Sequence, residues 1–188
     1  MAPSFRAAST RKRPWRLATN WKSSLRWAEG RSSMEAKLQS RRATPFDAEV
    51  LTELNLELLR DDASGGATTP AKIKARMLDW LSSGEYAAVL FEHEGEVVAY
   101  ALYREQNASI YLRQFFVAKN RRRLGLGRRA LAVLFEEYWP DGKRLSVDVL
   151  TSNERALAFW RSVGFLDYCT TLIMAPKQRP TLSPRTSL

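Results

Sequence analysis

The sequence predicts an α/β domain in which a mixed β-sheet carries helices on both faces. Three observations predict this fold class. The chain has 188 residues, 45% of them hydrophobic, which is long enough for one well-buried core and short for two. Segments with a helical repeat of apolar residues are interspersed with segments rich in β-branched and aromatic residues. Proline, glycine and polar clusters separate these segments and define their ends.

The first half of the domain is expected to contain one strand and two helices. Residues 37–43 form a short strand, and residues 44–47 form a turn with Thr44 or Asp47 as N-cap. Apolar residues then recur at helical spacing through residue 60. After a polar loop at residues 61–69, Pro70 opens a second helix that ends near Gly84.

The second half is expected to be mostly sheet, with two further helices. The predicted strands cover residues 86–91, 97–103, 110–117, 145–150 and 168–174, and the predicted helices cover residues 127–138 and 153–163. The resulting order, β-α-α-β-β-β-α-β-α-β, indicates a mixed sheet with helices on both faces.

Composition excludes several kinds of chemistry. Cys169 and His93 are the single cysteine and the single histidine, so an intrachain disulfide cannot form. A zinc site or a Ser-His or Cys-His catalytic pair is not expected either, and we predict no metal. A lone cysteine fits a reducing, cytoplasmic location, and without an apolar run of about 18 residues we expect no membrane span.

The net charge of +10 is concentrated at the two ends of the chain. Residues 1–33 hold eight Lys and Arg against Glu29, and residues 175–188 add three basic residues. Residues 34–174 have equal numbers of basic and acidic side chains. We therefore predict a basic, disordered extension (1–33), one folded domain (34–174) and a disordered tail (175–188). The folded domain itself is not expected to bind nucleic acid.

The basic extension permits several interpretations. Leu17, Trp21, Leu25 and Ala28 recur at helical spacing among basic residues, which is compatible with a membrane surface, an anionic partner or an organellar presequence. A nucleic-acid-binding arm would show steeply salt-dependent affinity. We favour the simpler interpretation, in which these residues are disordered or an upstream extension that is not normally translated.

A basic, glycine-containing loop between a strand and a helix carries the strongest functional signal. Val117 ends the strand, Gly125 and Gly127 follow a run of basic residues, and a helix begins. A helix N-terminus offers unpaired N–H groups and partial positive charge, and glycines allow close approach of an anion. The pattern predicts a site for a polyanion such as a pyrophosphate.

Three other interpretations of this loop compete. A P-loop needs Gly-Lys-Ser/Thr, which is absent. Residues 125–130 match the dinucleotide pattern G-x-G-x-x-A, but about seven residues separate them from their strand, and Asp148 lies within the next strand instead of closing it. For the loop by itself, a third alternative remains: a solvated basic turn whose glycines serve only the geometry of the chain.

Two motifs resemble those of the GNAT superfamily of N-acetyltransferases. Arg122, Gly125 and Gly127 match the R-x-x-G-x-G of motif A, at a similar distance from the strand end. The second stretch resembles motif B, N-x-x-A-x-x-F-Y-x-x-x-G-F, and the matching residues are Asn153, Ala156, Phe159, Gly164 and Phe165. The resemblance covers about residues 35–174. It implies a single domain with a mixed, mostly antiparallel sheet of six to seven strands and helices on both faces.

The resemblance also implies acetyl-CoA as acyl donor and an amine, of a small molecule or a peptide, as acceptor; a homodimer is compatible with it. In the family the strand before the loop bulges, and its backbone pairs with the pantetheine arm. A backbone N–H of the bulge near Phe116 would polarise the thioester carbonyl. The implied cofactor-binding residues are Phe115, Phe116, Val117, Arg122, Arg123, Leu124, Gly125, Leu126, Gly127, Arg128, Asn153, Phe159 and Trp160.

One departure from the family affects proton transfer. Trp160 replaces the tyrosine of the Phe-Tyr pair, which resembles a bacterial-type subset with Phe-Trp, and an indole N–H is too weak an acid to protonate a thiolate. A thiolate needs less help than an alkoxide, so direct acetyl transfer to a primary amine remains our prediction. Glu105 and Tyr111 are the candidate catalytic groups. The alternative is a catalytically weak or inactive module that binds acyl-CoA as a sensor or interaction protein.

Overall fold

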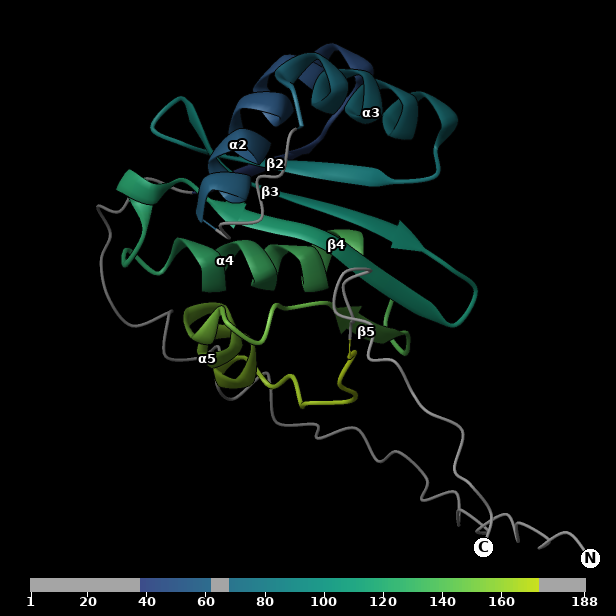
Figure 1. Cartoon of the computed structure of the whole chain (residues 1–188), viewed down its shortest axis with the longest axis vertical. Coiled ribbons are helices and arrows are strands. Elements are labelled where there is room, and N and C mark those ends of the chain that lie inside the picture. Colours follow the sequence, from purple (N-terminus) through teal and green to yellow (C-terminus); the bar gives the residue numbers. More distant parts are fainter. Residues whose placement is uncertain (1–37, 62–67, 173–188) are drawn as a thin grey trace, which may run out of the picture.

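A computed structural model of the chain describes residues 38–61 and 68–172 (Figure 1). In this part of the chain, one five-stranded sheet has the strand order β1-β2-β3-β4-β5. Neighbouring strands are antiparallel except for β4 and β5, which are parallel. The prediction of an α/β domain with a mixed, mostly antiparallel sheet is therefore confirmed.

The bounds of the elements follow the predicted order closely. The strands are β1 (Gln39–Arg42), β2 (Ala87–His93), β3 (Glu96–Glu105), β4 (Ser109–Val117) and β5 (Arg144–Val147). The helices are α2 (Ala48–Asp61), α3 (Pro70–Ser83), α4 (Leu126–Val133) and α5 (Glu154–Ser162). Two 3-10 turns, η2 (Pro45–Asp47) and η3 (Lys119–Arg121), and a π-helical turn, η4 (Leu134–Tyr138), complete the described elements.

Local signals at its two ends explain why α3 forms where the sequence predicts it. The Thr69 hydroxyl accepts a 3.4 Å hydrogen bond from the Lys72 N–H, and Pro70 occupies the first turn, where its missing N–H costs nothing. Gly84 ends the helix with φ 71°, a left-handed conformation that glycine adopts without strain.

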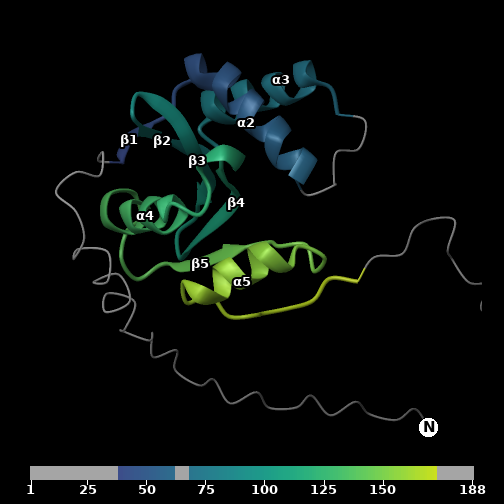
Figure 2. The same cartoon turned by 90° about the vertical axis from the view of Figure 1, so that its left-hand side faces the viewer.

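Helices cover both faces of the sheet, as predicted (Figure 2). On one face, here called the α2/α3 face, Leu51, Ile73 and Met77 are fully buried against the strands. On the other, the α4/α5 face, Leu134 and Trp160 belong to a second buried cluster. Each strand of the middle of the sheet therefore contributes side chains to two separate apolar layers.

A β-bulge in β4 changes which side chains reach each face. Leu102 of β3 lies opposite Gln114 and Tyr103 lies opposite Leu112, so Arg113 is an extra residue in β4. Two consecutive side chains, those of Arg113 and Gln114, consequently lie on the α2/α3 face. The family resemblance suggested a bulge near Phe116, but the structure has it three residues earlier.

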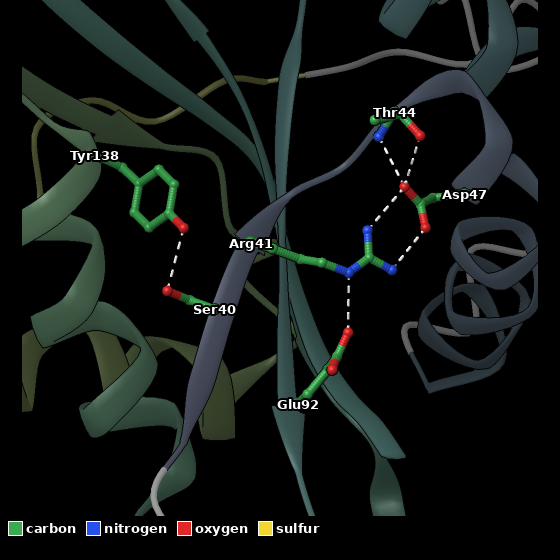
Figure 3. Close-up of polar contacts among 6 residues, drawn as sticks. All are labelled: Ser40, Arg41, Thr44, Asp47, Glu92 and Tyr138. Atoms are coloured by element: carbon green, nitrogen blue, oxygen red, sulfur yellow. Dashed lines mark hydrogen bonds and ion pairs between the residues drawn. The ribbon is translucent and has the colours of Figure 1, made fainter. Parts of the chain in front are cut away.

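The edge strand β1 is tied to the start of α2 by a polar network (Figure 3). The Arg41 guanidinium donates to Asp47 at 2.8 and 3.0 Å and to Glu92 of β2 at 3.0 Å. The Thr44 N–H donates to the same Asp47 carboxylate at 2.7 Å. These bonds to Arg41 and Thr44 lower the pKa of Asp47 to about 2, against the opposing effect of burial.

The described residues form a sheet of five strands, where six to seven were expected, and two predicted elements end earlier. Residues 168–172 form no strand, because they have no partner strand in the described part of the chain and their apolar side chains stay exposed, Leu172 at 90%. The predicted helix 127–138 is α4 followed by the π-turn η4, in which the Trp139 N–H reaches the Leu134 carbonyl. The strand predicted at 145–150 ends at Val147. Residues 1–33 and 175–188, expected to be disordered, lie outside the described residues.

Candidate active site

Strands β4 and β5 separate before β4 ends, and the candidate site lies where they part. Their parallel pairing runs from Ser109 opposite Arg144 to Leu112 opposite Val147. Beyond this point β5 ends, whereas β4 continues to Val117 with pairing to β3 alone. We call this divergence the fork; it begins at the residue next to the Arg113 bulge.

The backbone of β4 beyond the fork presents hydrogen-bonding groups on the side that β5 has left. The Ala118 N–H donates to the Val98 carbonyl at 2.8 Å. In an antiparallel ladder the direction of the backbone groups alternates, so Phe116 also faces β3, and Phe115 and Val117 face the fork. Of the three residues expected to pair with a pantetheine arm, Phe115 and Val117 thus have backbone groups on the side of the fork, and Phe116 has them on the side of β3.

The N-terminus of α4 follows at the same end of β4. Its N-cap, Gly125, has φ 73°. Within residues 38–61 and 68–172 no side chain caps its first N–H groups, and no acidic residue lies in its first turn. By contrast, Thr69 caps α3, and the Asn153 side chain caps α5 by accepting from the Ala156 N–H at 3.0 Å. The first turn of α4 therefore combines N–H groups lacking a side-chain cap with the positive end of the helix dipole, which suits an anion.

Two arginines of the loop hold it to the rest of the domain. The Arg122 Nε donates to the Val117 carbonyl at 2.8 Å, and its guanidinium pairs with Asp61 at the end of α2 and lies 5.1 Å from the Phe116 ring. Arg121 pairs with Glu94 and Glu96 of the β2–β3 turn at 3.2 and 2.7 Å. These side chains fix the position of the loop; Arg122 thus contributes to the site through the backbone that it holds in place.

The loop between these arginines and α4 is exposed and has an unusual backbone. Arg123 has φ 66°, which is uncommon for a residue with a side chain, and Gly125 follows two residues later with a similar value. Leu124 is 58% exposed. Arg128, in the first turn of α4, donates to the Ser162 hydroxyl at 2.8 Å and so links α4 to α5.

An aromatic cluster joins β4 to α5 on the α4/α5 face. The Phe115 and Phe159 rings stack with centroids 6.0 Å apart, and Trp160 lies 5.5 Å from Phe115 and 4.9 Å from Phe165. A Cβ added to Gly127 would lie 3.4 Å from the Phe159 ring, in van der Waals contact with it, so α4 packs beside α5 at this point. Trp160 is 7% exposed and belongs to the core, whereas Phe159 is partly exposed beside the loop.

Sequence reasoning missed the partner of Tyr111. The Tyr111 hydroxyl donates a 2.8 Å hydrogen bond to Asp148, the first residue after β5. Burial raises the pKa of Tyr111, and the hydrogen bond to the Asp148 carboxylate raises it further. This pair lies at the base of the fork, because Tyr111 is opposite Ser146 in the last part of the parallel ladder. A contact across 37 residues leaves no local signal in the sequence.

The two candidate catalytic residues do not meet. Glu105 ends β3 opposite Ile110, and its carboxylate pairs with Lys143 at 2.5 Å. By strand alternation Glu105 lies on the same face as Tyr103, the α4/α5 face, whereas Tyr111 packs on the α2/α3 face. Glu105 is thus at the rim of the sheet, on the opposite face from Tyr111.

The described residues contain neither a cluster of metal ligands nor a membrane-spanning helix. Among residues 38–61 and 68–172, no group of three or more His, Cys, Asp or Glu side chains is arranged to hold a metal ion. No helix in these ranges has the length and apolar character needed to cross a membrane.

Comparison with solved structures supports the fold. The chain is similar to an acetyltransferase from Thermus thermophilus, with 23% identity, a TM-score of 0.61, and coverage of 71% of this chain and 90% of that one. It is similar to the aminoglycoside N-acetyltransferase AAC(6')-Iy in complex with CoA, with 13% identity, a TM-score of 0.62, and coverage of 78% and 99%. A predicted acetyltransferase with acetyl-CoA from Clostridium acetobutylicum shares 12% identity and a TM-score of 0.59, with coverage of 76% and 99%.

Sequence comparison identifies the family. No curated protein sequence matches the chain. The model of the acetyltransferase (GNAT) family matches residues 52–165, which include most of α2, the fork, the α4 loop and α5. Together with the uncapped α4 N-terminus beside the fork, this match shows that the chain belongs to the GNAT family of acetyltransferases.

Proposed function

We propose that this protein transfers the acetyl group of acetyl-CoA to a primary amine of a small molecule or peptide, by direct attack of the amine on the thioester. One observation carries the proposal: the fork and the uncapped N-terminus of α4 lie at the same end of β4. An extended ligand with a pyrophosphate at one end and a thioester at the other could engage both. The AAC(6')-Iy structure to which the fold is similar contains CoA.

In this proposal the backbone binds most of the cofactor. N–H groups of residues 123–128 would hold the pyrophosphate, with Arg121 and Arg122 fixing the loop. The backbone groups of Phe115 and the N–H of Val117, whose carbonyl accepts from Arg122, would pair with the amides of the pantetheine arm. Phe159 would line the arm from α5. Asn153 contributes by capping α5, and Trp160 by packing beneath Phe115 and Phe159.

The thioester would then lie near the bulge, at the base of the fork. The amine nitrogen forms a bond to the carbonyl carbon, and the backbone N–H of Phe115, which faces the fork, stabilises the developing oxyanion. Collapse of the tetrahedral intermediate breaks the C–S bond. The nitrogen loses a proton and the thiolate gains one, so the products are an acetamide and free CoA thiol.

Tyr111 and Asp148 are the groups best suited to the proton transfer. The Asp148 carboxylate is exposed at the base of the fork, and the Tyr111 hydroxyl fixes its orientation. A raised pKa keeps Tyr111 protonated at neutral pH, so it acts as a hydrogen-bond donor and not as the base. We assign acceptance of the amine proton to Asp148, directly or through water. Glu105, held by Lys143 on the other face, is the less suitable candidate.

A second candidate function rests on Trp160. Where the family has a phenol, this chain has a buried indole that packs against three aromatic rings. A protein with this substitution could bind acyl-CoA without turnover, as a sensor or an interaction partner. A cytoplasmic location, expected from the single cysteine, supplies acetyl-CoA to either function.

One assay separates the two functions. The full chain is mixed with acetyl-CoA and a panel of amino acids, peptides, polyamines and aminoglycosides, and free thiol is measured over time. Acetyl transfer predicts amine-dependent thiol release with one acetylated product per thiol, identified by mass spectrometry. Tight acetyl-CoA binding without amine-dependent thiol release would instead support the sensor.

A further inference from the structure

Guanidinium groups and aromatic rings form a stack on the α2/α3 face beside the fork. The guanidinium carbons of Arg76, from α3, and Arg113, from the bulge, each lie 5.0 Å from the centroid of the Trp80 ring. Arg113 also lies 5.8 Å from the Tyr86 ring centroid, and Arg104 lies 5.5 Å from the same centroid. Because both cations lie 5.0 Å from one ring centroid, their guanidinium carbons are at most about 10 Å apart, within the range over which the charge of Arg113 acts on Arg76.

The charges in this stack are compensated at one end and uncompensated at the other. Arg104 pairs with Glu85 at 3.2 Å. Neither Arg76 nor Arg113 forms an ion pair with any carboxylate in residues 38–61 and 68–172. The Nε atoms of Arg76 and Arg104 are both buried without an acceptor among the described residues. Burial, followed by the charge of Arg113, lowers the pKa of Arg76.

Neutral groups hold Arg76 in this position. Its Nη2 donates to the Asn55 side-chain oxygen at 3.4 Å, and Asn55 donates in turn to the Tyr100 hydroxyl at 3.2 Å. The Tyr100 hydroxyl donates to Gln114, the residue after Arg113, at 3.1 Å. These hydrogen bonds fix the Arg76 cation next to β4 without neutralising its charge. Holding an unpaired charge away from water costs free energy, and an anionic ligand would offset that cost.

The uncompensated pair adjoins the base of the fork. Arg113 follows Leu112, the last residue of β4 that pairs with β5, and its side chain is exposed. Tyr111, two residues earlier, lies on the same face, with its hydroxyl on Asp148. A molecule whose amine reached Asp148 from this face would place its neighbouring atoms beside Arg113.

Cation–π packing by itself does not account for this arrangement. Arg104 stacks on Tyr86 in the same way and still has a carboxylate partner. An arginine that stacks on a ring can therefore still form an ion pair with a carboxylate. Two positive charges beside one ring repel each other, and a bound anion would reduce this repulsion.

From this juxtaposition we infer that the acceptor is an amine that carries a carboxylate near its reacting nitrogen, such as a free amino acid. The inference rests on the proposed acetyl transfer and specifies its substrate class. The carboxylate pairs with the exposed Arg113, where the nearby charge of Arg76 also attracts it, and the amine points towards Asp148. A planar guanidinium matches a carboxylate with paired hydrogen bonds, and Arg76 and Arg113 repel polycationic amines such as polyamines and aminoglycosides.

The test compares matched acceptors and matched variants. The full chain is assayed with acetyl-CoA and each of the twenty amino acids, with the carboxamides of those that react, and with spermidine and an aminoglycoside. Arg113→Gln and Arg76→Gln are compared with Arg104→Gln, which removes the same charge from the same stack at its compensated end. We expect the carboxamide of the best amino acid to have a kcat/KM at least about 10-fold lower than the acid. Arg113→Gln should raise KM for the acid about 10- to 100-fold and leave KM for acetyl-CoA and for the carboxamide unchanged. Arg104→Gln should leave all three KM values unchanged.

Two results would overturn the inference while acetyl transfer stands: carboxamides or polyamines acetylated as well as the acids, or equal effects of Arg113→Gln and Arg104→Gln on KM for the acid. If no amine releases thiol, the proposed function fails, and binding of a pool of N-acetyl-amino acids decides the inference separately by saturation-transfer NMR. Signals that are lost with Arg113→Gln and kept with Arg104→Gln support a carboxylate site. An absence of binding to the wild-type chain contradicts it.

Discussion

The Tyr111 hydroxyl donates a 2.8 Å hydrogen bond to the carboxylate of Asp148 at the place where β4 and β5 part. This relationship connects the two strands that define the fork and orients a carboxylate there. In our account Asp148 accepts the proton that the attacking amine loses.

Asp148→Asn is therefore expected to lower kcat about 100-fold, since it removes the proton acceptor and keeps the size of the side chain. Tyr111→Phe should have a smaller effect, about 10-fold, because the carboxylate remains and loses one hydrogen bond. KM for acetyl-CoA should not change in either variant. Steady-state thiol release measures both constants, and a wild-type kcat for Asp148→Asn would exclude this role.

For Glu105, in contrast to Asp148, we expect that loss of the carboxylate hardly changes kcat. Its carboxylate pairs with Lys143 at the rim of the sheet, on the face away from Tyr111. Glu105→Gln should change kcat less than about 3-fold and stability by no more than about 1 kcal/mol, as for other exposed ion pairs. The same assay decides between the two carboxylates: a larger loss with Glu105→Gln than with Asp148→Asn would reverse our assignment.

Arg122 and Arg123 are neighbours with different expected roles. Arg122→Ala removes the bond to the Val117 carbonyl and the ion pair with Asp61, so we expect a loss of about 1–3 kcal/mol in stability and about 10-fold weaker CoA binding. Arg123→Gly relieves a positive φ, so stability should be equal or up to about 1 kcal/mol higher. Thermal unfolding and calorimetric titration with CoA measure both. A greater loss of stability with Arg123→Gly would contradict the assigned roles.

The hydrogen bonds and ion pair of Asp47 make the free energy of unfolding depend on pH in the acid range. The pKa of Asp47 is lowered from 3.8 to about 2, so its contribution is present above about pH 4 and is lost as the pH falls towards 2. Because Arg41 is partly exposed, we expect this contribution to be about 1 kcal/mol. Urea unfolding between pH 2 and 6 should show a shallower acid loss for Asp47→Asn than for wild type. Asp167→Asn, which breaks the more exposed pair with Arg161, is the control and should flatten the acid profile less than Asp47→Asn does.

Features with local causes were predicted well from the sequence. The ends of α3 follow from Thr69, Pro70 and Gly84, which act within one turn of the helix. The α4 loop was found for the same reason, because its glycines and the helix start are adjacent in the chain. Local conformational preferences fix such segments regardless of distant contacts.

Features that depend on distant partners were missed. Residues 168–172 have the composition of a strand, but a strand forms when another strand pairs with it, and composition does not report the pairing. The bulge at Arg113 has no glycine or proline to mark it, so Arg113 and Gln114 could not be assigned to the α2/α3 face. The contact of Tyr111 with Asp148 and the approach of Arg113 to Trp80 follow from this register and were equally hidden.

The proposed CoA site depends on the N-terminus of α4, and substitutions at two glycines test it. Gly125 and Gly84 have almost the same φ, 73° and 71°, and a Cβ added to either would contact nothing within 4 Å. Substitution by glutamate should therefore cost similar stability at the two positions, about 1 kcal/mol. At Gly125 alone, the new carboxylate would lie where the pyrophosphate is expected to bind.

The most direct measurement is calorimetric titration of acetyl-CoA into the full chain and into these two variants. We predict one site per chain in the wild type, unchanged affinity within about 3-fold for Gly84→Glu, and at least about 100-fold weaker binding for Gly125→Glu because of charge repulsion at the helix N-terminus. Equal affinity of acetyl-CoA for Gly125→Glu and Gly84→Glu would contradict the proposed site.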